Sequence, residues 1–150
     1  MNVSGYPSST LPLHPTSSCR NAGSPGGPRI LLVDDEPLVA RIVADFLSPA
    51  ASYLGRVSSG REALEAFEGK SFELLVTDQV MPGMDGISLA QKLKRTHPHL
   101  KVILISGIRP RLSPSLENGR SAVDRFLAKP FTQNELLEAV DTLLGTPQAT

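Results

Sequence analysis

Five short apolar runs dominate the sequence after residue 28, and four of them are followed by segments in which apolar residues recur at helical spacing. The runs cover residues 29–34, 52–57, 72–77, 102–105 and 123–127. Continuous apolar runs of this length are typical of strands buried on both faces of a parallel sheet. The helical spacing predicts helices over residues 37–47, 59–67, 85–93 and 132–144. A short further helix is expected between Pro110 and the last strand, at about residues 113–119.

Capping patterns mark where three of these helices begin. Ser59 with Glu62, and Thr132 with Glu135, match the capping box, in which a hydroxyl residue and a glutamate three positions later bond each other's backbone N–H groups. Asp85 is an acceptor suited to the N-cap of the helix that follows it. Strands and helices therefore alternate, which indicates an α/β fold with a parallel sheet and helices on both of its faces.

Composition divides the chain into three regions. Residues 1–28 are rich in Pro, Ser and Gly and contain no Asp or Glu, so they cannot bury enough apolar area to offset the entropy of ordering them. We expect a flexible tail or linker over residues 1–28, one domain over 29–145 and a short tail over 146–150. The last of these regions is too short for an output module, so we expect none in this chain.

Charge and cysteine content argue against several classes of protein. Lys and Arg number 15, as do Asp and Glu, so the chain lacks the basic excess that nucleic-acid or membrane-surface binding requires. No apolar run approaches the ~20 residues of a membrane helix, and no secretory signal is visible. The one cysteine, Cys19, cannot form an internal disulfide. We therefore expect a cytoplasmic protein that binds neither nucleic acid nor membranes directly.

Polar residues stand where the predicted strands end. Asp34 and Asp35 close the first run, Asp78 and Ser106 follow the third and fourth, and Lys129 comes just after the fifth. The carboxyl ends of parallel strands share one edge of the sheet, where α/β proteins bind ligands. Three carboxylates at one edge would repel each other. A hard divalent cation such as Mg²⁺, which prefers oxygen ligands, would relieve that repulsion.

The same residues fit a phosphoryl transfer. The Asp78 carboxylate can attack phosphorus and form an acyl phosphate. Mg²⁺, the Lys129 ammonium and the Ser106 hydroxyl would stabilise the negative charge that the transition state carries.

Four motifs carry a resemblance to a known family. They occupy residues 30–37 (ILLVDDEP), 75–86 (LVTDQVMPGMDG), 102–107 (VILISG) and 126–131 (FLAKPF). Together and in this order, they resemble the receiver domain of bacterial response regulators, the phosphorylated switches of two-component and phosphorelay signalling. The resemblance implies a flavodoxin-like, doubly wound (βα)5 fold with a five-stranded parallel sheet in the order 2-1-3-4-5.

The resemblance also implies roles for the polar residues. Asp78 would accept phosphate from a phosphohistidine on a histidine kinase or histidine phosphotransfer protein. Asp34 and Asp35 would hold Mg²⁺ together with Asp78 and the backbone carbonyl of Val80. Lys129 would pair with Asp78 at rest and with the phosphate after transfer.

Two further residues match the family's switch positions. Ser106 would move to bond a phosphate oxygen, and Phe126 lies where the family has a rotating aromatic residue. The Lys129–Pro130 peptide corresponds to one that is usually cis. Partner binding would change at the face formed by the predicted helix at 113–119 and the strand and helix after it. Many receivers dimerise on phosphorylation, so a phosphorylated homodimer is one implied outcome.

Purely structural roles are the alternatives for several of these residues. Asp34 and Asp35 could cap the helix at 37–47, and Ser106 could bond only local backbone. Phe126 could belong to the core, and that interpretation has as much support from the sequence as the switch role.

Apolar side chains at two positions bear on the fate of the phosphoryl group. Val80 and Ile108 stand where polar side chains of this family can orient the attacking water, so the resemblance implies slow self-hydrolysis. A Mg²⁺-dependent aspartyl-phosphate phosphatase would need a second carboxylate two residues after the nucleophile, where this chain has Val80. We therefore expect no enzyme activity beyond assistance to the chain's own phosphorylation and dephosphorylation.

Two non-enzymatic alternatives stay open. A receiver that binds partners without phosphate would share this sequence pattern. A flavodoxin-like cofactor binder would need phosphate-cradling groups where the chain has Asp-Asp-Glu-Pro at residues 34–37. The sequence does not separate a free-standing protein from a receiver detached from a hybrid histidine kinase, although Met1 slightly favours the free-standing protein.

Overall fold

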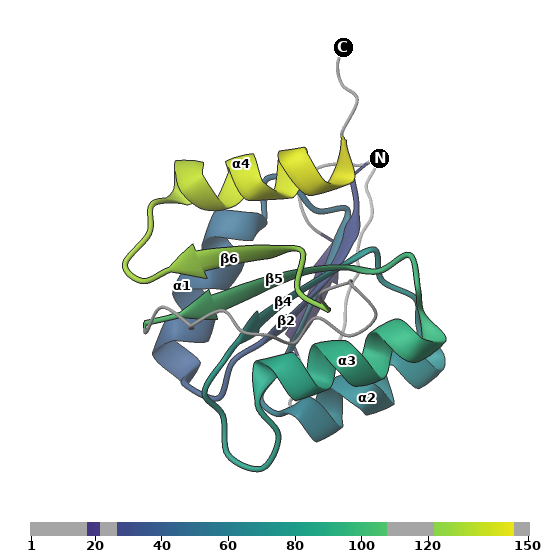
Figure 1. The fold of residues 1–150 in the computed structure, drawn as a ribbon. Helices are drawn as coiled ribbons and strands as arrows, with labels where there is room; N and C mark the ends of the chain where they lie inside the picture. Colours follow the sequence, from purple (N-terminus) through teal and green to yellow (C-terminus); the bar gives the residue numbers. More distant parts are fainter. Residues whose placement is uncertain (1–17, 22–26, 108–121, 146–150) are drawn as a thin grey trace.

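The computed structural model describes residues 18–21, 27–107 and 122–145, which form one sheet flanked by helices (Figure 1). The strands are β1 (Ser18–Asn21), β2 (Arg29–Val33), β3 (Tyr53–Val57), β4 (Leu74–Asp78), β5 (Lys101–Ser106) and β6 (Arg125–Ala128). The helices are α1 (Pro37–Leu47), α2 (Gly60–Gly69), α3 (Gly86–Thr96) and α4 (Gln133–Leu144). Within the described ranges, no helix has the length and apolar character needed to cross a membrane.

The sheet confirms the predicted fold class. Its order is β1-β3-β2-β4-β5-β6, and the five strands from β2 to β6 all run parallel. Counted from β2, those five strands have the order 2-1-3-4-5. The predicted helix at 113–119 lies outside the described residues.

The sixth strand, β1, was not predicted. It pairs antiparallel with the outer edge of β3, from Ser18 opposite Arg56 to Asn21 opposite Tyr53. The expectation of an unstructured tail over the whole of residues 1–28 was wrong at 18–21. A strand of four residues at a sheet edge is held by backbone hydrogen bonds to its neighbour, so it needs no alternating apolar pattern that a sequence could reveal.

Two hydrophobic layers hold the sheet between its helices. Alternate residues of each central strand point to opposite faces, so Ile30 and Leu32 pack with α1 and α4, whereas Leu31 and Val33 pack with α2 and α3. Figure 1 shows these two helix pairs on opposite sides of the strands. Because both faces of β2 and β4 are covered, the carboxyl ends of these strands are held on a rigid support.

The predicted helix starts are present, with one difference. Thr132 and Glu135 form the complete capping box of α4, and the Asp85 side chain accepts a hydrogen bond from Ser88 N in α3. Ser59 accepts from Glu62 N, but the Glu62 carboxylate accepts from Ser58 N. The box predicted for α2 is therefore only half formed.

The last strand begins at Arg125, later than predicted, and Asp124 just before it bonds two neighbouring elements through its side chain. Its carboxylate accepts from Val102 N at 2.8 Å and from Lys94 Nζ at 2.7 Å. These bonds join the entrance of β6 to β5 and α3. Regular pairing then runs from Arg125 to Ala128.

Helix α3 approaches the end of β4 very closely at Gly86. A Cβ atom at this position would lie 2.5 Å from the Asp78 carbonyl oxygen and 2.6 Å from Leu104 Cδ1. Only glycine leaves room for this approach, and the backbone oxygen cannot move aside without displacing the strand end.

We expect Gly86→Ala to lower the free energy of unfolding by about 1–3 kcal/mol, because the added methyl group overpacks the contact between α3 and β4. Urea denaturation would measure this. Gly69→Ala is the matched control: Gly69 is the last residue of α2, and a Cβ there would meet nothing within 4 Å. That substitution should be neutral or slightly stabilising. Equal losses in the two variants would show that space at Gly86 is not limiting.

Candidate functional site

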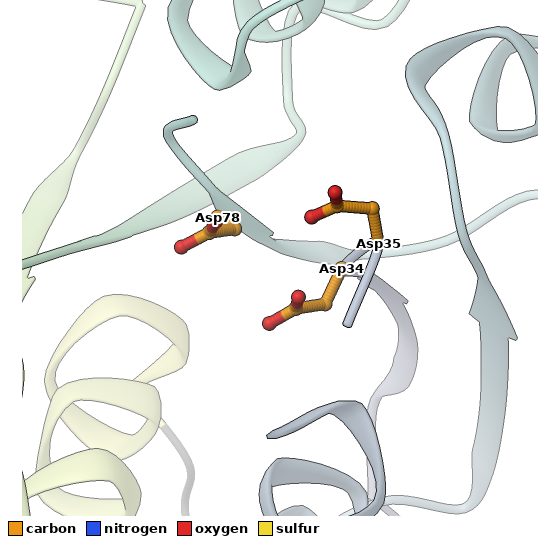
Figure 2. Close-up of side chains that lie close together, drawn as sticks. All are labelled: Asp34, Asp35 and Asp78. Carbon is orange, nitrogen blue, oxygen red and sulfur yellow. The ribbon is translucent and has the colours of Figure 1, made fainter. Parts of the chain in front are cut away.

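Three carboxylates converge at the carboxyl edge of the sheet. Asp34 and Asp35 directly follow β2, and Asp78 ends the adjacent strand β4. One carboxylate oxygen from each residue lies within 4.8 Å of the others. Figure 2 shows the three side chains gathered on the same side of the two strand ends. The convergence predicted from parallel alignment is therefore present.

A lysine brings positive charge to this cluster from the other side. Lys129, which follows β6, places its Nζ 3.1 Å from Asp78 Oδ1. Its backbone N–H donates to the Ser106 carbonyl at 3.0 Å, which ties the residue to the end of β5. The Lys129–Pro130 peptide is cis, as the resemblance implied. The pairing of this lysine with Asp78 agrees with the expected resting state.

Asp34 is the carboxylate of the cluster whose pKa responds clearly to its surroundings. The pKa of its carboxyl is raised from 3.8 to about 6, chiefly by burial and in smaller part by the negative charges of Asp78 and Asp35. A hydrogen bond from Glu36 N and the Lys129 charge act in the opposite direction but do not cancel the shift. The side chain is only 3% exposed, so water gives little compensation. A cation would relieve this penalty.

The geometry fits Mg²⁺ better than it fits a purely structural role for the aspartates. The N-cap of α1 is Glu36, no side chain caps that helix, and Pro37 at its start has no N–H to be capped. Neither Asp34 nor Asp35 is the N-cap residue, and the bond that Asp34 makes near the helix start is with Glu36 N, one residue before the helix. Clustered carboxylates with one abnormally basic member form a donor set that a hard divalent cation satisfies.

The remaining predicted residues come from β5, from β6 and from the loop after β4. Ser106 ends β5 beside the strand of Asp78 and is buried. Val80 lies in the loop after β4 with its side chain 69% exposed. Phe126 on β6 is 44% exposed, so the alternative that placed it in the core is wrong. Ile108 lies outside the described residues.

Two residues near the site were not singled out from the sequence. Gln79 directly follows Asp78 and bonds the start of α3, and Gly86 makes the close approach to Asp78 described above. A polar residue between a strand-ending aspartate and a helix cap was the available indication for Gln79. Its role depends on which helix N–H groups lie within reach, and only the folded chain shows that.

A parallel α/β sheet of this order, with an acidic cluster and a paired lysine at its carboxyl edge, defines the receiver class of signalling domain. The chain belongs to that family: the response regulator receiver domain matches residues 30–141. Members of the family act in two-component signalling, bind Mg²⁺ at an acidic pocket and interact with histidine kinases or phosphotransfer proteins.

Individual relatives agree with this assignment. The response regulator receiver protein CpdR of Brucella abortus is 34% identical over 117 residues, which are 77% of this chain and 96% of that protein. The chain spans about half the length of several other relatives, which are transcriptional regulatory proteins.

Solved receiver structures have the same fold. The receiver domain of an HD domain-containing protein from Pseudomonas fluorescens aligns with a TM-score of 0.70 and 28% identity, over 79% of this chain and 95% of that one. The response regulator TrrA from Thermotoga maritima, solved in complex with Mg²⁺ and BeF, aligns with a TM-score of 0.64 and 29% identity, over 77% and 97%.

The raised pKa of Asp34 predicts a pH-dependent stability. A carboxyl whose folded pKa exceeds its unfolded value stabilises the fold below the unfolded value, near 3.8, and this contribution is lost as pH rises through about 6. Without Mg²⁺ at about pH 7.5, Asp34→Asn should therefore exceed wild type in unfolding free energy, by up to about 3 kcal/mol. The difference should shrink toward about pH 4.5.

Urea denaturation of both proteins at the two pH values, with and without Mg²⁺, checks this. Asparagine keeps the acceptor for Glu36 N, so only the charge is changed. Added Mg²⁺ should stabilise wild type more than Asp34→Asn. An Asp34→Asn protein that is less stable than wild type at neutral pH without Mg²⁺ would contradict the claim that the buried Asp34 charge destabilises the fold.

Proposed function

We propose that this chain is a phosphorylation-dependent switch in which Asp78 accepts a phosphoryl group from a phosphohistidine on a histidine kinase or histidine phosphotransfer protein. The observation that carries the proposal is the pairing of Lys129 with Asp78 inside the acidic cluster, with Nζ 3.1 Å from Oδ1. A lysine at that distance places a positive charge beside the acceptor, where it can stabilise the negative charge of the phosphoryl group during transfer.

Each residue of the site has a part in the transfer. A carboxylate oxygen of Asp78 forms the new P–O bond as the P–N bond to the donor imidazole breaks. Asp34, Asp35, Asp78 and the Val80 carbonyl would hold Mg²⁺, which supplies positive charge to the phosphoryl oxygens. Lys129 follows the charge from Asp78 to the phosphoryl group, and the Ser106 hydroxyl donates to one of its oxygens.

The strand pairing supports a route from the site to the surface. Ser106 is the register partner of Ala128 on β6, and Phe126 lies two residues earlier on that strand, hence on the same face. Movement of Ser106 toward the phosphate would shift this edge and draw the half-exposed ring of Phe126 inward. We infer that partner affinity, including self-association, changes at the face made by β6 and α4.

The other functions have less support. A Mg²⁺-dependent phosphatase lacks its second carboxylate, because Val80 occupies that position. In a flavodoxin-like cofactor binder, the cofactor's phosphate would lie beside the negative charges of Asp34 and Asp35 and would be repelled by them. A receiver that binds partners without phosphate would not require the Lys129–Asp78 ion pair or an Asp34 carboxyl with a raised pKa. Phosphorylation by a small-molecule donor distinguishes this function from the proposed one.

Incubation with acetyl phosphate, followed by intact-protein mass spectrometry, tests the acceptor. We expect a single phosphoryl addition that requires both Mg²⁺ and Asp78, so it is absent with EDTA and in Asp78→Ala. Purified histidine kinase serves as a second donor for a protein that acetyl phosphate leaves unmodified. Addition that survives in Asp78→Ala would place the acceptor elsewhere, and no addition from either donor would favour the phosphate-independent receiver.

We expect slow self-hydrolysis of the phosphorylated protein. The Val80 side chain is exposed, so it does not cover the site. We expect it to slow hydrolysis because it has no polar group that could orient the attacking water. Val80→Asn or Val80→Glu should therefore shorten the phosphate half-life by about 10-fold or more. Mass spectrometry at intervals after removal of the donor measures this. A wild-type half-life of seconds in Mg²⁺, or an unchanged half-life in both variants, would refute the expectation.

A further inference from the structure

Gln79 connects the residue after the phosphate acceptor to two other elements. Its backbone N–H donates to the Ile105 carbonyl of β5 at 2.9 Å, and its carbonyl accepts from Gly86 N at 3.0 Å. Its side-chain Oε1 accepts from Ile87 N at 3.1 Å. The first bond extends the sheet beyond Asp78, and the other two attach the start of α3.

These bonds account for the first N–H groups of α3. A helix leaves its first N–H groups without partners in its own backbone. The N–H groups of Gly86 and Ile87 both bond Gln79, whereas that of Ser88 bonds the Asp85 side chain within the same turn. Two side chains therefore cap the helix: Asp85 from the N-cap position, and Gln79 from the other end of the loop.

The loop between these two caps carries a group that the proposed site needs. Residues 80–85 leave β4 at Gln79 and return to Gln79 through Gly86 and Ile87. Val80 directly follows Gln79, whose bonds to Gly86 and Ile87 close this loop. The Val80 carbonyl is a ligand in the proposed Mg²⁺ site. Gly86 also lies against the Asp78 carbonyl, so a shift of α3 would move the acceptor itself.

We propose that Gln79 is a positioning residue whose side chain, through its bond to α3, holds Asp78 and the Val80 carbonyl in place for Mg²⁺ binding and phosphoryl transfer. The inference rests on the proposed function, since it assigns Gln79 to the same site. A residue that orients metal-binding groups from outside the ligand set typically affects metal affinity by 10-fold or more, whereas a simple cap contributes only about 1 kcal/mol of stability.

Two caps of one helix provide a matched comparison. Gln79→Met keeps the side-chain size but removes the acceptor for Ile87 N, and Asp85→Ala removes the local acceptor for Ser88 N. Isothermal titration calorimetry with Mg²⁺ is the binding measurement, because the chain has no tryptophan to report by fluorescence. The rate of labelling by the phosphoryl donor that modifies wild type, and thermal unfolding, complete the set.

We expect both variants to lose a similar amount of stability, with only Gln79→Met binding Mg²⁺ about 10-fold more weakly and reacting more slowly. Gln79→Glu, which keeps an acceptor beside Ile87 N and suits a helix start, should restore Mg²⁺ binding. If Gln79→Met does not fold, Gln79→Asn replaces it, since its shorter amide does not reach Ile87.

The outcomes separate this inference from the proposed function. Wild-type Mg²⁺ affinity in Gln79→Met, or equal weakening in Asp85→Ala, would overturn the positioning role while leaving the switch intact. A wild-type protein that neither binds Mg²⁺ nor accepts phosphate would overturn the proposed function, and the positioning role with it.

Discussion

Repulsion among three carboxylates at one sheet edge is the constraint on which the rest of the site depends. Asp34, Asp35 and Asp78 are brought together by two adjacent parallel strands, and burial of Asp34 raises the pKa of its carboxyl to about 6. The fold tolerates this arrangement because its stability comes from elsewhere, in the two apolar layers that cover both faces of the sheet. The site is therefore poised for positive charge, which Lys129 supplies only in part.

The rigid sheet that brings the three carboxylates together also makes the site sensitive to added negative charge. A strand buried on both faces cannot move its end freely, so the carboxylates cannot spread apart to lower their repulsion. Under the proposed function, negative charge added at Asp78 would be met by movement of less constrained parts of the domain. Lys129 and Phe126 lie on the last strand and its following loop and are partly exposed, which suits them to such movement. A local electrostatic change can thus alter a surface some distance away.

Much of the fold and most of the site could be predicted because both depend on local patterns. Continuous apolar runs, the capping box at Thr132 and the N-cap at Asp85 report directly on the elements they begin or fill. Strand β1 and the role of Gln79 could not be predicted, since each depends on backbone groups that come near only after folding. Phe126 was undecided from sequence, because an aromatic residue in a strand is equally suited to core and surface until its neighbours are placed.

The sequence by itself determined the alternation of the five parallel strands with the helices from α1 to α4, the acidic and basic residues at the strand ends, and the receiver family. These follow from residue type and spacing, which act within a few residues along the chain. Only the tertiary structure decided that Lys129 reaches Asp78, that Asp34 holds its proton unusually tightly, and that Gln79 joins the acceptor to α3. Those properties depend on the distances between segments far apart in sequence and on how deeply their side chains are buried. Both are fixed only when the chain has folded.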